Sequence, residues 1–80
     1  MTEVLIHSAC VVLTEECKYV SPIRHDGNFD VYDLDVGKQY WVGCGNITYK
    51  ILVNAKGFEI VEIGLMSIDF YCKRVMVDEA

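Results

Sequence analysis

The sequence has few basic residues, a single proline and no long apolar run. Seven Lys and Arg stand against twelve Asp and Glu, which gives a formal net charge of −5. Binding to a phosphate backbone depends on clusters of Lys and Arg that displace counterions. The scarcity of positive charge therefore argues against nucleic acid as a direct partner.

Long hydrophobic segments are missing as well. No stretch reaches the roughly 18 apolar residues that a helix needs to cross a bilayer. Residues 4–13 are apolar but are interrupted by His7 and Ser8, and Glu3 precedes them where a signal peptide has Lys or Arg. We therefore expect no membrane anchor and no signal peptide, and we predict a cytoplasmic protein.

The four cysteines could be either reduced thiols or paired in disulfides. Without a signal peptide, the four cysteines are expected to be reduced thiols, since the cytosol keeps most thiols reduced. A removed leader would instead allow them to pair, with a connectivity that the sequence does not choose. They are Cys10, Cys17, Cys44 and Cys72.

Motifs of catalysis and metal binding are also missing. The chain has no Gly-x-Ser-x-Gly elbow and no Gly-rich phosphate loop, and Cys44 between two glycines is typical of a turn. Soft ligands occur at His7, Cys10, Cys17 and His25, but His7 and Cys10 would point to opposite faces of a strand. We expect no enzyme activity, no cofactor and no metal site.

Apolar and β-branched residues, by contrast, are abundant. They fill residues 47–77 almost without interruption around a single break, Asn54 to Gly57, which predicts a β-hairpin. Residues 58–77 are too long for one flat strand, so we expect a bend at Gly64 or at residues 67–69, with a bulge at Lys73-Arg74 as a further option. Eighty residues are too few for two cores, so residues 1–80 form one domain.

The first half of the chain also has a strand-like pattern. Residues 29–34 and 39–42 are predicted strands, and the turn at residues 35–38 would join them as a second hairpin. Another turn at residues 43–46 leads into the next strand, which would give a three-stranded meander. Residues 15–28 should be a loop with a short strand at residues 17–20.

Residues 4–14 carry enough β-branched residues to favour a buried strand. A helix at about residues 4–20 is the alternative, because apolar residues there also follow a helical stripe. The predicted fold is all-β, a small antiparallel meander of five to six short strands in a half-barrel or sandwich; the helix would make it α+β.

Two features suggest a contact surface. Asp26, Asp30, Asp33 and Asp35 fall within ten residues that contain no Lys or Arg. Aspartates two apart on a strand lie roughly 6.5 to 7 Å apart, similar to successive phosphates, so Asp33 and Asp35 could mimic nucleic acid. A solvated strand face is the simpler explanation.

The second feature is the adjacent pair Tyr40-Trp41, whose side chains point to opposite faces of a strand. We expect one to pack inward and the other to face water, where it could anchor a partner. The alternative is that Trp41 is the main core residue.

These features predict a small acidic, non-enzymatic binding protein. We expect an inhibitor of viral or mobile-element type that occludes a larger nucleic-acid-handling or host-defence protein with a basic surface. The alternative is a self-assembling subunit, such as a homodimer, that pairs through open sheet edges. The predicted partner-binding residues are Asp26, Asp30, Tyr32, Asp33, Asp35, Tyr40 and Trp41.

Overall fold

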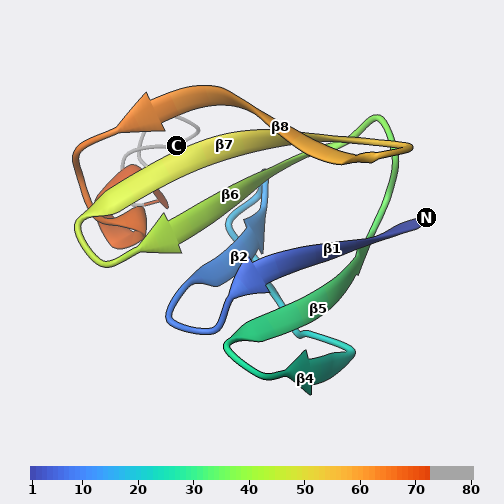
Figure 1. The fold of residues 1–80 in the computed structure, drawn as a ribbon. Helices are drawn as coiled ribbons and strands as arrows, with labels where there is room; N and C mark the ends of the chain where they lie inside the picture. The colour runs from blue at the N-terminus through green and yellow to red at the C-terminus, as the bar shows by residue number, and fades with distance from the viewer. Residues whose placement is uncertain (73–80) are drawn as a thin grey trace.

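The computed structural model describes residues 1–72, which fold into two antiparallel sheets and one short helical turn at residues 68–72 (Figure 1). The three-stranded sheet has the order β1-β5-β4, and the five-stranded sheet has the order β3-β2-β6-β7-β8. The strands are β1 (Thr2–His7), β2 (Val11–Thr14), β3 (Tyr19–Val20), β4 (Arg24–Asp26), β5 (Phe29–Leu34), β6 (Gln39–Cys44), β7 (Ile47–Asn54) and β8 (Gly57–Gly64).

The predicted all-β fold is confirmed, and the N-terminal helix is not seen. The segment predicted as one strand is divided by a turn, in which the Cys10 amide donates to the His7 carbonyl (2.9 Å) and the Ala9 amide donates to His7 Nδ1 (3.1 Å). β1 and β2 thereby enter different sheets. Within residues 1–72 no helix is long and apolar enough to cross a membrane.

The predicted hairpin of residues 29–42 is wrong. β5 pairs with β1 and β4, whereas β6 pairs with β2 and β7, so the turn at residues 35–38 carries the chain from one sheet to the other. This connection bonds to β7: the Gly37 amide donates to the Val53 carbonyl (2.8 Å), and the Val53 amide donates to the Lys38 carbonyl (3.0 Å). A turn signal shows where the chain bends but not which strand it pairs with.

The hairpin at the Asn54 to Gly57 break is confirmed. β7 and β8 pair across this break, where Gly57 adopts a φ of 134° and the Lys56 amide donates to Asn54 Oδ1 (2.9 Å). The meander therefore consists of β6, β7 and β8. Upstream, β3 falls within the predicted strand at residues 17–20, and the Asp26-Gly27 turn joins β4 to β5.

The C-terminal strand ends at the predicted bend, Gly64. The following residues are not extended as predicted: residues 68–72 form a helical turn. Ser67 begins this turn as a cap, since its hydroxyl accepts from the Phe70 amide (3.4 Å). The predicted bulge at Lys73-Arg74 lies outside the described residues.

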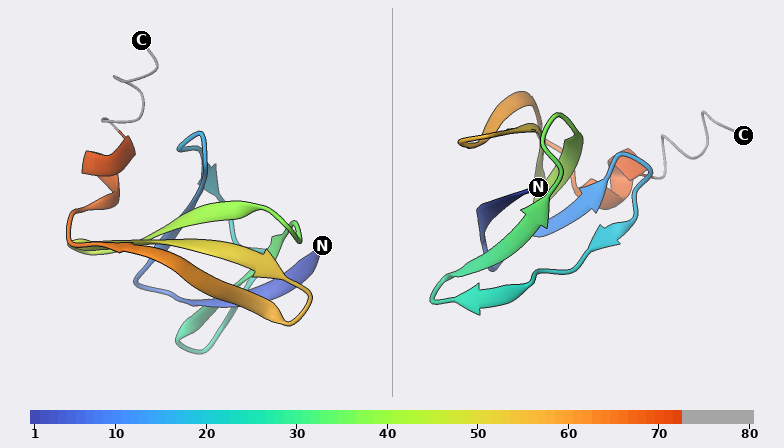
Figure 2. Two further views of the ribbon diagram at one scale, coloured as in Figure 1. Left: turned by 90° about the horizontal axis from the view of Figure 1, so that it is seen from above. Right: turned by 90° about the vertical axis from the view of Figure 1, so that its right-hand side faces the viewer.

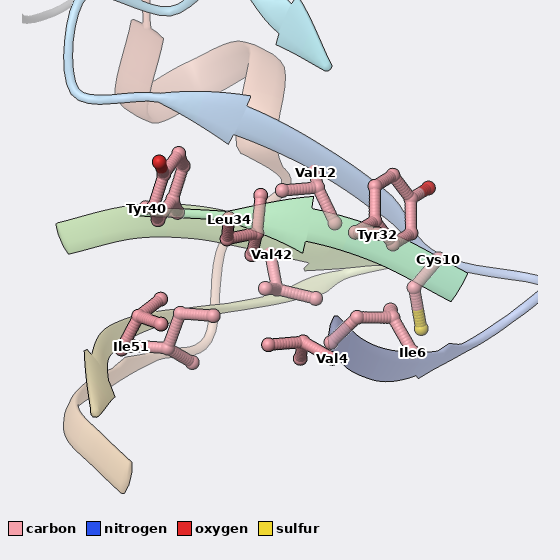
Figure 3. Close-up of a cluster of buried hydrophobic side chains, with 10 residues drawn as sticks. Val4, Ile6, Cys10, Val12, Tyr32, Leu34, Tyr40, Val42 and Ile51 are labelled. Carbon is pink, nitrogen blue, oxygen red and sulfur yellow. The ribbon is translucent and has the colours of Figure 1, made fainter. Parts of the chain in front are cut away.

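The main core lies between the two sheets (Figure 3). Its buried residues are Val4, Ile6, Cys10, Val12, Tyr32, Leu34, Tyr40, Val42, Ile51 and Val53. A second, smaller cluster of Leu13, Trp41 and Ile68 lies where the helical turn packs on the five-stranded sheet, with Cys17, Tyr71 and Cys72 against it. Both faces of the central strand β6 are therefore covered.

All four cysteines are paired, so the expectation of reduced thiols is wrong for this structure. Cys10–Cys44 joins the start of β2 to the end of β6 (Cα–Cα 4.4 Å). Cys17–Cys72 joins the turn after β2 to the helical turn (Cα–Cα 5.7 Å). The sequence did not distinguish these pairs, because both require the tertiary arrangement of distant segments.

The cross-strand neighbours Ile51 and Ile60 allow a matched test of the core. Ile51 is 0% exposed and Ile60 is 51% exposed. Ile51→Ala should lower the free energy of unfolding by about 2–5 kcal/mol because it leaves a cavity between the sheets. Ile60→Ala should cost less than about 1 kcal/mol. Urea denaturation measures both, and equal losses would contradict this placement of the core.

Candidate interaction surface

The outer edge of β8 is the strongest candidate for an interaction surface. β8 is the last strand of the five-stranded sheet, and within residues 1–72 no strand pairs with its outer edge. Figure 2 shows β8 at the margin of the molecule, on the side where β1 also lies. An unpaired edge presents backbone N–H and C=O groups that another strand can use.

Apolar side chains are exposed along this strand and just after it. The exposed fraction is 51% at Ile60, 65% at Ile63 and 81% at Leu65, and Val61 and Met66 are also exposed. Single exposed apolar residues are common, but a contiguous group of them marks a site of interaction. We call these five residues, together with the free backbone of β8, the β8 edge.

A β-bulge brings two residues of the β8 edge to one face of the strand. Lys50 pairs with Glu62 and Ile51 pairs with Ile60, so Val61 is an extra residue in β8. Residues three apart on a regular strand point to opposite faces, but the extra residue brings Ile60 and Ile63 to the same face. Phe58 at the start of this row packs on the core, whereas the two isoleucines after it are increasingly exposed.

Two glutamates occupy the opposite face of β8. Glu59 pairs across the strands with Leu52, and Glu62 pairs with Lys50. The Lys50 ammonium is directed elsewhere, at 3.5 Å from the Glu15 carboxylate and 5.0 Å from the centre of the Trp41 ring. Among residues 1–72, Glu59 and Glu62 form no salt bridge. The strand β8 is therefore apolar on the face of Ile60 and Ile63 and acidic on the face of Glu59 and Glu62.

The four aspartates predicted as an acidic surface do not share one face. Asp30 is buried on the inner side of the three-stranded sheet, where its carboxylate contacts His25 Nδ1. Asp33 lies on the outer side opposite Glu3, and Asp26 lies opposite Phe29. Asp35 follows the end of β5 and pairs with Lys38 (Nζ to Oδ2, 3.3 Å). The mimicry hypothesis requires Asp33 and Asp35 to be neighbours on one strand. They are not, because β5 ends at Leu34.

The predicted aromatic anchors are all buried. Tyr40 and Trp41 do point to opposite faces, but the expectation that one faces water is wrong. Tyr32 and Tyr40 lie in the main core (Figure 3), and the Tyr40 hydroxyl accepts from the Asp35 amide (3.1 Å). Trp41 stacks on Tyr71 with ring centres 5.5 Å apart. The partner-binding role of all seven residues stays a prediction.

Burial also affects the ionisation of two tyrosines. Loss of contact with water raises the pKa of Tyr32, and the nearby Asp30 carboxylate adds to this effect. Burial likewise raises the pKa of Tyr49. Both shifts favour the protonated hydroxyl.

The helical turn that covers Trp41 fits closely against two glycines. A Cβ on Gly43 would lie 2.7 Å from the Ile68 Cβ, and one on Gly64 would collide with the Tyr71 hydroxyl. The Thr48 hydroxyl donates to the Met66 carbonyl (2.8 Å), and the Cys17–Cys72 disulfide closes the contact. Gly64 thus serves close packing as well as the predicted bend.

Away from the β8 edge, the described surface also carries polar side chains around a hollow. A shallow polar hollow is lined by Thr14, Glu15, Glu16, Asp35, Lys38, Gln39 and Tyr40. In the part of the chain that the structure describes, no group of three or more His, Cys, Asp or Glu side chains is placed to hold a metal ion. Comparisons of the chain with protein-family models, with curated proteins and with solved structures found no match.

Loss of the Cys17–Cys72 disulfide should release the helical turn from Trp41. The double variant Cys17→Ser/Cys72→Ser should lose about 2–4 kcal/mol of stability, because a long loop is no longer closed in the unfolded chain. Trp41 emission from the folded protein should shift to longer wavelength. The control Cys10→Ser/Cys44→Ser removes the bridge on the other face and should leave that emission unchanged. An emission shift in the control variant alone would contradict the conclusion that Cys17–Cys72 holds the helical turn over Trp41.

The Glu3–Arg24 pair on the three-stranded sheet allows an electrostatic test. Arg24 donates two hydrogen bonds to the Glu3 carboxylate (2.7 and 3.3 Å), and these bonds lower the pKa of Glu3. Because the folded-state pKa is lowered, the stabilisation is present above the unfolded pKa and is lost as the pH falls through the folded one. Arg24→Gln should raise the pKa of Glu3, measured by NMR titration, and Lys38→Gln should not.

Proposed function

We propose that this chain is a non-enzymatic binding protein that docks on a larger protein with a basic surface, and that it docks through the β8 edge. The observation that carries the proposal is the row of exposed apolar side chains on a strand whose outer edge is unpaired within residues 1–72. A partner that covers this row gains both apolar burial and backbone hydrogen bonds.

Charge supports a basic partner. The net charge of −5 attracts a positive surface over a distance and speeds the encounter. Glu59 and Glu62 add negative charge next to the apolar row, where basic side chains of the partner could pair with them. Electrostatic attraction of this kind mainly sets the association rate and the choice of partner, whereas the buried apolar residues supply affinity.

The proposed consequence of docking is inhibition. Proteins that handle nucleic acids carry the basic surfaces that an acidic protein fits, and a bound domain would occlude such a surface. We therefore propose an inhibitor of a nucleic-acid-handling or host-defence protein, of the type that viruses and mobile elements use. The cytoplasmic location stays a prediction, and the two disulfides weigh against it because the cytosol keeps most thiols reduced.

Self-assembly is the second candidate, since the same open edge could pair with another copy. Two observations weigh against it. If two β8 strands paired antiparallel about their centre, Glu59 of each copy would lie opposite Glu62 of the other. Like charges opposite each other destabilise a sheet. The bulge at Val61 also twists the edge, which is a common protection against pairing between copies.

Affinity capture with a matched control tests the proposal. The purified protein is used as bait in a lysate of its source cells at low and then high salt. The wild type should retain a basic protein that high salt releases, and Ile60→Lys/Ile63→Lys should not retain it. Tyr19→Lys/Ile23→Lys introduces the same charges at two exposed apolar sites, of which Tyr19 lies on β3 at the opposite end of the five-stranded sheet, and this variant should retain it.

Three results would contradict the proposal. Undiminished capture by the β8 variant would remove the β8 edge as the docking surface. Equal loss in both variants would show that overall charge, and not this edge, determines binding. Retention of the protein's own copies alone, with a melting temperature that rises with concentration, would favour self-assembly.

A further inference from the structure

We infer that the partner contributes an extended segment that adds to β8 as a further antiparallel strand, and that this segment alternates apolar and basic residues. The inference rests on the proposed function, because it specifies how the β8 edge is occupied.

The exposed residues of β8 locate the free part of the edge. Exposure increases from Phe58, which packs on the core, through Ile60 and Ile63 to Leu65. The segment that can accept a strand is therefore the second half of β8, which ends at Gly64. Antiparallel addition continues the pattern of the sheet, in which every pair of neighbouring strands is antiparallel.

The two faces of β8 determine the residue pattern of the incoming strand. On the face of Ile60 and Ile63, cross-strand neighbours should be apolar, because they would cover side chains that are now in water. On the face of Glu59 and Glu62, cross-strand neighbours should be Lys or Arg. Successive side chains of a strand point to opposite faces, so a strand that supplies apolar residues to one face and basic residues to the other alternates the two kinds.

The neighbouring sheet edge favours strand addition over contact through side chains alone. β1 is one of the two outer strands of the three-stranded sheet, and it contacts β8. Within residues 1–72, one unpaired edge of each sheet thus lies on the same side of the molecule (Figure 2). A strand added to β8 would extend the five-stranded sheet on this side and shield apolar residues that neither sheet covers.

The bulge limits the partner to a short segment. Val61 interrupts the regular spacing of backbone groups along β8, so a long flat strand could not keep its hydrogen bonds along the whole edge. A short segment can pair on one side of the bulge or adjust to it. This restriction also disfavours continuous growth of a sheet through many copies.

Synthetic peptides test the inference with the full-length protein. The probe is a short peptide of about six residues that alternates isoleucine and lysine, and its matched control alternates isoleucine and glutamate. The lysine peptide should bind, and hydrogen exchange read by NMR should slow at backbone amides of β8. The glutamate peptide should bind at least about tenfold more weakly at low salt, because each favourable cross-strand charge pair becomes a repulsive one.

A second peptide tests the backbone contribution. The lysine peptide with methyl groups on alternate backbone nitrogens keeps its charge but cannot form the full ladder of hydrogen bonds, and it should lose most of its affinity. Equal binding by the methylated peptide would overturn strand addition. Slowed exchange away from β8, or no binding by the lysine peptide, would overturn it as well.

The outcomes separate this inference from the proposed function. If the captured partner depends on Ile60 and Ile63 but leaves exchange at the β8 amides unchanged, docking through the β8 edge holds and strand addition fails. If capture does not depend on these isoleucines, the proposed function itself fails. Protection of the β8 amides that increases with the concentration of the protein alone would identify the occupant as a second copy and overturn the basic partner.

Discussion

The burial of both faces of β6 is the constraint on which the rest of the structure depends. Tyr40 and Val42 project from β6 into the core between the two sheets, and Trp41 projects to the opposite side. The helical turn at residues 68–72 covers Trp41 and fits against Gly43, which has no side chain to obstruct it. An 80-residue chain can bury few residues in one core, so covering a second face increases its stability.

The disulfides support this arrangement from its two sides. Cys10–Cys44 ties the ends of β2 and β6 on the side of the main core, and Cys17–Cys72 ties the helical turn over the second face. Cys17 has a φ of 64°, in the left-handed region that non-glycine residues seldom adopt. The turn hydrogen bonds between Thr14 and Lys18 hold this conformation and direct Cys17 toward its partner. Small domains often depend on such covalent links where the core is limited.

The same constraint determines which part of the surface is free to bind. Because β6 is central and covered on both faces, its aromatic residues Tyr40 and Trp41 are buried in the folded state. The strand farthest from β6 on one side of the sheet, β8, has less to pack against and leaves its apolar residues in water. A candidate interaction surface thus results from the position of a strand in the sheet, more than from the composition of that strand.

The sequence by itself determined most of the local structure of this protein, although not the helical turn at residues 68–72. Alternating apolar residues predicted most of the strands, and the break at Asn54 to Gly57 predicted the β7–β8 hairpin, because both signals act between residues close in the chain. Only the tertiary structure decided the partners of β5, the burial of Trp41, the pairing of the cysteines and the exposure of Ile60 and Ile63. These properties depend on contacts between distant segments, and a local pattern does not specify which of several apolar segments will meet.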